Sequence, residues 1–356
     1  TDGGQHSLFQ AHMGKVYRAF FARLDLAILR PCGDDSRRLG PPFLRDDAGQ
    51  PTRESGFYLS ANRNKRSITV DLARPEGQQI VRDLAARADV LIENYKVGDL
   101  ARYGLDAATL CRMRPRLVYC SITGFGQTGP YAARAGYDSI FQGMGGLMAV
   151  TGHAEGEPGG GPQKVGLIVS DLMAGMYASV AILAALEHRD AVSGLGQHID
   201  LALLDAQVAA LSHAAMGYLV SGDAVPRCGT QSPTAAPSQM YRCQDGAVML
   251  VVGNKAQWEK FCAVIDRPEL PADARFASNQ ARIQHRGELN AILEPILLAQ
   301  PRQHWIDALA AVGVPCGPVN ELHEVFDDPQ VRARGMLAHM RHPHRAAMPM
   351  LANPIR

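Results

Sequence analysis

This chain has no excess of positive or negative charge. Lys and Arg number 36 against 35 Asp and Glu, so the net charge is +1 over 356 residues. Without a basic or acidic field, neither a nucleic acid nor an anionic membrane is expected as the main partner. The 46% share of hydrophobic residues is ordinary for a folded protein and, at this length, sufficient for two domains.

Cysteine is sparse, and no two cysteines have the spacing CxxC. Scattered thiols in odd number are typical of a reducing compartment, and they argue against a disulfide framework and a structural zinc site. The seven are Cys32, Cys111, Cys120, Cys228, Cys243, Cys262 and Cys316.

Long hydrophobic runs are also missing. A run such as 173–186 is too short and too rich in small residues to predict a membrane span. No basic segment followed by an apolar one opens the chain as in a signal peptide. The predicted location is the cytoplasm, with a mitochondrial or peroxisomal one left open.

Several motifs of common enzymes are absent. There is no HExxH, and His342 and His344 have no evident third ligand, so no metal is predicted. There is no GxSxG of a serine hydrolase. The glycine runs at 124–126, 143–146 and 159–161 lack the spacing of a dinucleotide fingerprint or a P-loop, and taken alone they predict turns.

What is present is an alternation of strand and helix. Strands are predicted over 67–72, 90–93 and 116–123, separated by helices from Pro75 and over about 105–113. This order predicts an α/β fold with a parallel sheet. Ligands of such sheets bind beyond the carboxyl ends of the strands, here at Glu93-Asn94-Tyr95 and at 123–126.

The remaining segments are predicted less sharply. Phe20, Phe21, Leu24, Ile28 and Leu29 could line one face of a helix, and 32–50 has the composition of an exposed loop. Helices are predicted over about 172–188 and 201–220. After a break at 226–237, a strand over 247–252 and helices near 255–265, 286–299 and 302–312 predict a second, smaller α/β domain.

Asp171 is the most informative single residue. It is expected to stand directly before the helix over 172–188, where an aspartate is commonly an N-cap. It could also be a nucleophilic carboxylate, kept ionised by the positive end of that helix. Both interpretations use the same geometry, so the local sequence leaves them open.

Several stretches, in this order and spacing, resemble the class III acyl-CoA transferase family, of the formyl-CoA transferase and carnitine CoA-transferase type. The resemblance runs from about residue 31 to the last residue. The motifs that carry it are Asn62–Leu72, Asp89–Tyr95, Ser121–Pro130, Gly136–Asp138, Ser170–Tyr177 and Val314–Pro318.

The resemblance implies a mechanism and a set of site residues. Asp171 falls on the family's nucleophile, which forms a mixed anhydride and then an enzyme–CoA thioester. Lys65, Asn94, Tyr95 and Arg102 are expected against the coenzyme A moiety, and Tyr137 near the reacting thioester. Coenzyme A enters as a thioester substrate with a small carboxylic acid, and no tightly bound cofactor is expected. The motifs are most similar to the branch that acts on succinate and glutarate-type acids.

The resemblance also implies an architecture. Residues 1–225 are expected to form a large Rossmann-like domain that binds coenzyme A, and 226–325 a small domain whose loop over 229–239 covers the nucleophile. Residues 326–356 are expected to return to the large domain. Two chains are expected to interlock as a homodimer.

Two alternatives stay open at this point. An α-methylacyl-CoA racemase shares the fold but uses a histidine base where this chain has Tyr137, and a tyrosine with a pKa near ~10 is a poor base. The other is an inactive homologue. It is suggested by residues 1–30, which lack the family's apolar strand and Ala-Gly-Pro loop, and by the end at Arg356, where relatives continue.

Overall fold

The computed structural model of the protein describes residues 26–29, 33–63 and 65–355. Internal contacts group the chain into two units, each described here by itself. Unit 1 holds the described residues up to Thr151 with Pro162–Val225 and Ala338–Leu351. Unit 2 holds Gly152–Gly161, Pro226–Leu337 and the residues from Ala352. The domain boundaries predicted at 225 and 325 stay predictions.

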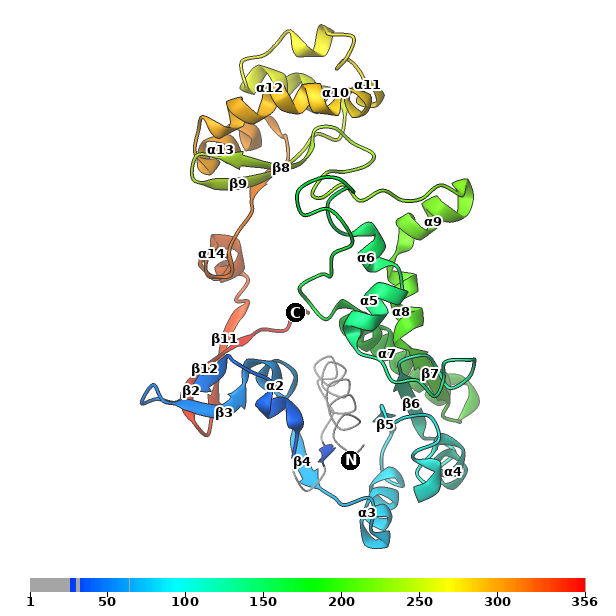
Figure 1. Ribbon diagram of the computed structural model, residues 1–356. Coiled ribbons are helices and arrows are strands. Elements are labelled where there is room, and N and C mark those ends of the chain that lie inside the picture. The colour runs from blue at the N-terminus through cyan, green and yellow to red at the C-terminus, as the bar shows by residue number, and fades with distance from the viewer. Residues whose placement is uncertain (1–25, 30–32, 64, 356) are drawn as a thin grey trace. The chain divides into compact units, whose positions relative to one another are not determined.

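Unit 1 is organised around a parallel sheet of three strands in the order β5 (Val90–Glu93), β6 (Val118–Thr123) and β7 (His198–Ala202). All the residues of the central strand β6 are buried, as expected where helices cover both faces of a parallel sheet. The predicted α/β class with a parallel sheet is therefore confirmed (Figure 1).

The two faces of β6 pack in separate hydrophobic clusters because successive side chains of a strand point to opposite sides. Val118, Cys120 and Ile122 pack with small residues of the long helix α7 (Val169–His188). Tyr119 packs in a second cluster with Val81 and Leu110.

Two helices supply that second cluster. They are α3 (Pro75–Ala85) and α4 (Ala107–Met113), both predicted from the sequence. Pro75 occupies the first turn of α3, where a missing N–H costs no hydrogen bond. The side chain of Asp106 caps α4 by accepting the Thr109 N–H at 3.0 Å.

The first described residues correct the prediction for the beginning of the chain. Leu26–Leu29 form strand β1, which pairs in parallel with β4 (Arg66–Thr69), with Ile28 opposite Ile68. The helical face suggested for Ile28 and Leu29 is therefore wrong, and so is the expectation that no apolar strand lies in this region. A four-residue apolar run is too short for its period to separate helix from strand. Phe20, Phe21 and Leu24 lie outside the described residues.

The loop predicted over 32–50 also contains regular structure. A 3-10 turn, η1 (Asp35–Arg38), is capped by the side chain of Asp34, which accepts the Ser36 N–H at 3.0 Å. A hairpin of β2 (Phe43–Arg45) and β3 (Pro51–Ser55) follows, and then α2 (Gly56–Ala61). The polar side chains that predicted a loop are partly used as caps, which explains why Asp34 and Ser36 are buried.

The helix predicted over 201–220 is divided in the structure. Its first residues belong to β7, and the rest form α8 (Leu203–Ala210) and α9 (Ser212–Ser221), bent by 75° at the break.

The other short elements of unit 1 are η2 (Ala101–Tyr103), α5 (Asp138–Met144), α6 (Leu147–Val150) and η3 (Arg189–Ser193). Strands β11 (Leu337–His342) and β12 (Arg345–Leu351) pair with each other.

The apolar stretch around α7 is longer than the run considered from the sequence. Val169–Ser193 is long and apolar enough to cross a membrane by length and composition, and 39% of an 18-residue stretch within it is buried. Ala174, Ala178 and Ile182 of this helix pack against the parallel sheet. A helix in the core of a soluble protein can have the same length and composition, so these two properties are weak evidence for a membrane span.

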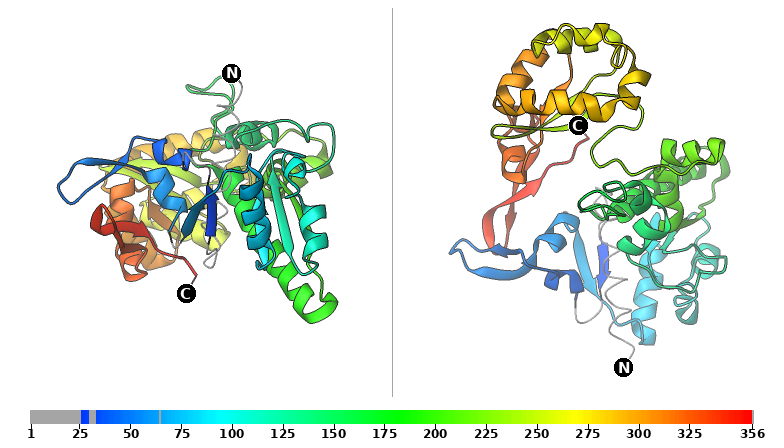
Figure 2. Two further views of the ribbon diagram at one scale, coloured as in Figure 1. Left: turned by 90° about the horizontal axis from the view of Figure 1, so that it is seen from below. Right: turned by 45° about the horizontal axis from the view of Figure 1, so that its top comes forward.

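Unit 2 contains an antiparallel sheet in the order β10 (Cys316–Pro318), β9 (Gly246–Val251), β8 (Ser238–Cys243). Its longer helices, yellow to orange in Figure 2, match the three predicted ones. They are α10 (Lys255–Val264), α12 (Arg286–Leu298) and α13 (Arg302–Val312); shorter ones are η4 (Leu270–Ala272), α11 (Asn279–Gln284), α14 (Leu322–Asp327) and α15 (Pro329–Ala333). Its core includes Trp258, Phe261 and Leu293.

Candidate active site

Asp171 lies in the first turn of α7, not before it. The helix begins at Val169, and its N-cap is Ile168, whose side chain makes no capping bond. The predicted start at Leu172 is therefore three residues late, and the N-cap interpretation of Asp171 is wrong. The first turn still places the carboxyl group at the positive end of a long helix, where a negative charge is stabilised.

The Asp171 carboxyl group is buried and without hydrogen-bond partners. The residue has 0% of its surface exposed, and neither side-chain oxygen accepts a hydrogen bond from the described residues. Leaving a buried polar group unbonded costs about 1–3 kcal/mol. An unbonded buried polar group therefore requires an explanation, and a catalytic role is one of the known ones.

The neighbouring residue, Ser170, is held by a buried polar network. Asp138, on α5, accepts the Ser170 N–H at 2.9 Å, and the Ser170 hydroxyl donates to Oε1 of Gln207 at 2.8 Å. Gln142 donates from Nε2 to Asp138 at 2.6 Å and to the Leu167 carbonyl at 2.9 Å. Three helices, α5, α7 and α8, thus fix the backbone beside Asp171.

This environment changes the acidity of Asp171. Burial, and then the negative charge of Asp138, raise the pKa of Asp171 to about 8. Both effects disfavour the ionised form. An acid with so high a pKa is a candidate for chemistry because perturbed acids concentrate at functional sites.

Tyr137 is the predicted site residue that lies nearest to this network in sequence. It is the N-cap of α5 and precedes Asp138, and 41% of its surface is exposed. A solvent-accessible phenol therefore stands beside the residue that holds the first turn of α7.

The other predicted site residues lie in two segments. Asn94 and Tyr95 follow β5 directly, and Asn94 is buried. Arg102 lies in η2, 4.0 Å from the Asp99 carboxylate, with its guanidinium 4.7 Å from the ring centre of Tyr103. Lys65 precedes β4 and donates to the Ala61 carbonyl.

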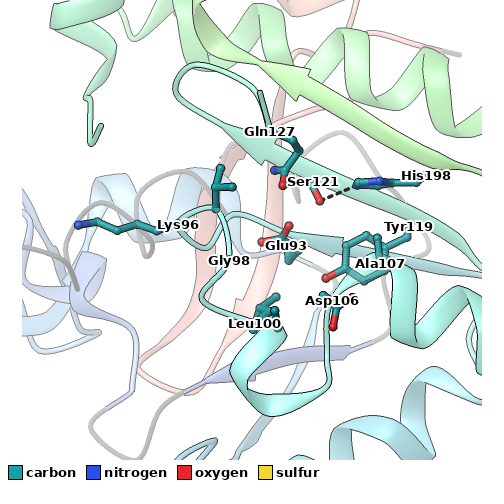
Figure 3. A pocket seen from close by; sticks show the side chains of 12 residues that line it. Glu93, Lys96, Gly98, Leu100, Asp106, Ala107, Tyr119, Ser121, Gln127 and His198 are labelled. Atoms are coloured by element: carbon teal, nitrogen blue, oxygen red, sulfur yellow. Dashed lines mark hydrogen bonds between the residues drawn. The ribbon is translucent and has the colours of Figure 1, made fainter. Parts of the chain in front are cut away.

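A small pocket of about 50 Å³ lies at the carboxyl end of β5, beside β6 and the beginning of β7 (Figure 3). The sequence analysis singled out Glu93 by its place at the end of β5 but missed Ser121 and His198. Their signal is the strand register, which sets Ser121 opposite Glu93 and His198 opposite Tyr119. The polar side chains of the lining are Glu93, Lys96, Asp106, Tyr119, Ser121, Gln127 and His198.

A search for metal ligands gives no candidate in the part of the chain that the structure describes. No group of three or more His, Cys, Asp or Glu side chains there could hold a metal ion.

Comparison with known proteins finds relatives along almost the whole chain. The model of a family described as CoA-transferase family III matches residues 27–356. A succinate–glutarate CoA-transferase of Agrobacterium fabrum is 44% identical over 323 residues, covering 91% of this chain and 79% of the relative. A succinyl-CoA:glutarate CoA-transferase of Homo sapiens is 39% identical over 319 residues, which cover 89% of this chain and 70% of the relative.

A solved structure supports the same relationship. A CAIB/BAIF family protein from Brucella suis is 41% identical and superimposes with a TM-score of 0.84, over 99% of this chain and 89% of that one.

Proposed function

Because the chain belongs to CoA-transferase family III and is an enzyme of that class, we propose that it transfers coenzyme A between dicarboxylic acids through Asp171. The observation that carries this proposal is the Asp171 carboxyl group, buried, without a hydrogen-bond partner among the described residues and placed in the first turn of α7.

The proposed reaction begins when a carboxylate oxygen of Asp171 attacks the thioester carbonyl of the donor. The carbon–sulfur bond breaks, coenzyme A leaves as a thiolate, and a mixed anhydride remains. The thiolate then attacks Cγ of Asp171, which releases the donor acid as a carboxylate and leaves an enzyme–CoA thioester.

The second half repeats these steps in reverse. The acceptor carboxylate attacks Cγ, the thiolate leaves, and a new anhydride forms. The thiolate attacks the acceptor acyl carbon, and the Asp171 carboxylate is regenerated. Each step exchanges one acyl bond for another, so neither an oxidant nor ATP is consumed.

The buried setting of Asp171 suits an anhydride intermediate. Water would hydrolyse the anhydride, and a nucleophile with 0% exposure is protected from it. The network of Asp138, Gln142 and Gln207 keeps the backbone of Ser170 in place. A fixed nucleophile loses little entropy as it meets the thioester.

The proposed coenzyme A site consists of residues that follow β5 and residues that precede β4. Lys65 and Arg102 would meet phosphates, Asn94 and Tyr95 the adenine or pantetheine portion, and Tyr137 the reacting thioester. The exposed guanidinium of Arg102, 62% accessible at its side chain, supports a role in contacting an anionic ligand.

The proposed substrates are four- and five-carbon dicarboxylic acids. The support is the naming of the bacterial and human relatives, both CoA-transferases of succinate or succinyl-CoA and glutarate. The racemase alternative is not favoured, because those relatives are transferases and Tyr137 is not the required histidine base. An inactive homologue is not favoured either.

A homodimer is part of the proposal. Large apolar side chains are exposed on α7 and α9, and such surfaces commonly mark subunit contacts. The domain division 1–225, 226–325 and 326–356 stays a prediction. The cytoplasmic location stays a prediction from composition.

One experiment tests the function. Purified protein is incubated with succinyl-CoA and each acid of a panel, and the coenzyme A esters are separated by mass. We expect glutaryl-CoA to form, and Asp171→Ala to form none. A wild type that transfers to no acid in the panel from any of several acyl donors would refute the proposal.

A second measurement tests the mechanism. Donor without acceptor should leave coenzyme A on the enzyme as a thioester. Hydroxylamine cleavage followed by peptide mass analysis should mark the peptide that holds Asp171. Modification of a cysteine peptide instead would rule out the carboxylate route.

A further inference from the structure

Three polar side chains from three adjacent strands meet beside the carboxyl end of β5. Glu93 ends β5, Ser121 lies opposite it on β6, and His198 begins β7. The Ser121 hydroxyl lies 3.0 Å from Nε2 of His198 and also bonds the Glu93 carboxyl group. Figure 3 shows Glu93 and His198 on the two sides of Ser121.

The direction of these hydrogen bonds follows from the groups involved. An ionised carboxylate can only accept, and a hydroxyl group has one hydrogen to donate. When Glu93 is ionised, Ser121 therefore donates to Glu93. His198 must then donate to Ser121 through a protonated Nε2. The sheet thus presents Glu93 with a donor whose own orientation is fixed from the next strand.

Glu93 also holds the backbone that follows it. Its Oε2 accepts the Tyr95 N–H at 2.7 Å, across a turn of three residues. The Glu93 side chain therefore connects β6 to the turn that carries Asn94 and Tyr95. Without this acceptor, the Tyr95 N–H loses this hydrogen bond, and the turn loses its connection to β6 through Ser121.

We propose that Glu93 is a positioning residue for coenzyme A binding, which holds the Asn94–Tyr95 turn in the shape that the ligand requires. The inference rests on the proposed function, because it takes this turn as part of the coenzyme A site. Glu93 acts through the turn and does not touch the reacting atoms. Ser121 and His198 act behind it by fixing the carboxyl group.

The surroundings of Glu93 agree with a positioning role. Burial raises the pKa of Glu93 to about 7, against the hydrogen bonds from Ser121 and the Tyr95 N–H, which lower it. Near neutral pH, Glu93 is present both as carboxylate and as carboxylic acid. Both forms have an oxygen that can accept the Tyr95 N–H, so the hydrogen bond to the turn does not depend on a full negative charge. Other titratable groups around Glu93 are Tyr95, Lys96, Asp106, Tyr119, Cys120 and His198.

The test compares Glu93→Ala with Glu93→Gln. The amide oxygen of glutamine can still accept the Tyr95 N–H, and its NH₂ group can donate to Ser121, so this variant keeps the connection. We expect Glu93→Ala to raise the Kd for coenzyme A and the KM for succinyl-CoA about tenfold, with kcat within about twofold of wild type. Glu93→Gln should stay within about threefold of wild type in each constant.

Asp106→Ala is the matched control. Asp106 is a carboxylate of the same pocket, but its hydrogen bonds go to Thr109 and cap α4. Its loss should lower the thermal midpoint and leave the Kd for coenzyme A unchanged. Ser121→Ala supplies a second test should Glu93→Ala not fold. In this variant Glu93 still accepts the Tyr95 N–H but no longer has the hydrogen bond from Ser121 that holds its carboxyl group. We expect the Kd for coenzyme A to rise about threefold.

Calorimetry with coenzyme A, steady-state kinetics and thermal melts provide the readouts. An active wild type whose Kd is unchanged in both Glu93→Ala and Ser121→Ala overturns the positioning role alone. A fall in kcat of Glu93→Gln at unchanged KM also overturns it, because Glu93 would then act in the chemistry. A wild type that neither binds coenzyme A nor transfers it refutes the proposed function, and this inference with it.

Discussion

At the scale of single residues, the burial of Asp171 suggests a conflict between activity and stability. Between pH 4 and 8 the native state holds a proton that the unfolded chain releases, because burial raises the pKa of Asp171 from 3.8 to about 8. Stability contributed by this group is therefore lost as pH rises through that window and is lowest above pH 8.

We predict that Asp171→Asn abolishes transfer and stabilises the fold. The amide cannot form the anhydride, and it never carries the charge that burial penalises. The gain in the free energy of unfolding should grow from pH 5 to pH 9 and reach up to ~5 kcal/mol. Denaturant titrations at several pH values measure it. A variant that is less stable than wild type at pH 9 would contradict this account.

Asp138 gives a second prediction at this scale, through the pH dependence of transfer. Only ionised Asp171 attacks, so with a pKa of about 8 the wild-type rate should rise with pH and level off above pH 8. Asp138→Asn removes a neighbouring negative charge, which should lower the pKa of Asp171 and move the rise to lower pH.

The same variant has a predictable cost. The new amide NH₂ would face the donating Nε2 of Gln142, so one buried hydrogen bond is lost, at about 1 kcal/mol. Rates from pH 5.5 to 9.5 with a saturating donor provide the measurement. Glu76→Gln, an exposed acid at the start of α3, is the control. A shift of the rise to higher pH in Asp138→Asn would refute the assignment of Asp171.

At the scale of elements, the packing of α7 depends on small residues. Ala174, Ala178 and Ala185 are buried where the helix meets β6 and its neighbours. Interiors of this density leave little room for added methylene groups.

We predict that Ala178→Leu destabilises unit 1 by about 1–3 kcal/mol through overpacking. Ala108→Leu makes the same change at an exposed position of α4 and should shift stability by less than about 0.5 kcal/mol. Denaturant midpoints of the two variants provide the comparison. Equal effects would show that the buried face of α7 has spare volume.

Elements with a clear period were predictable from the sequence. The helix from Pro75, the strand at Val90–Glu93 and the helices of unit 2 match the structure closely. Short segments were not. The apolar run Leu26–Leu29 and the mixed segment His198–Ala202 each form a strand by pairing with a partner that is distant in sequence. Asp34 and Ser36 were taken for loop residues because a cap and a loop share the same composition.

The candidate site was predictable in part. Asp171 was singled out, but its missing hydrogen bonds depend on how α5, α7 and α8 pack, and the sequence contains no signal for that. Ser121 and His198 escaped notice because their meeting with Glu93 depends on strand register.

At the scale of the whole molecule, the exposed apolar surface of unit 1 requires an explanation. Leu219 and Val220 of α9 are 70% and 78% exposed, and Val180 and Leu183 of α7 are 67% and 64% exposed. Large apolar side chains exposed to this degree on two helices are a common mark of an interaction surface. The family resemblance predicts a second copy of the chain as the partner that covers them.

We therefore predict that the wild type is a dimer and that the double variant Leu219→Lys, Val220→Lys is a monomer. Two charges placed in an apolar interface would lose their hydration without gaining partners, which costs several kcal/mol, or ~10²-fold or more in the dimer dissociation constant. Ile80→Lys, at an exposed apolar position of α3, is the control and should leave the dimer intact. Sedimentation velocity over a concentration series measures the mass of each species. A wild type that sediments at 38.4 kDa at all concentrations would exclude the dimer, and a dimeric double variant would place the interface elsewhere.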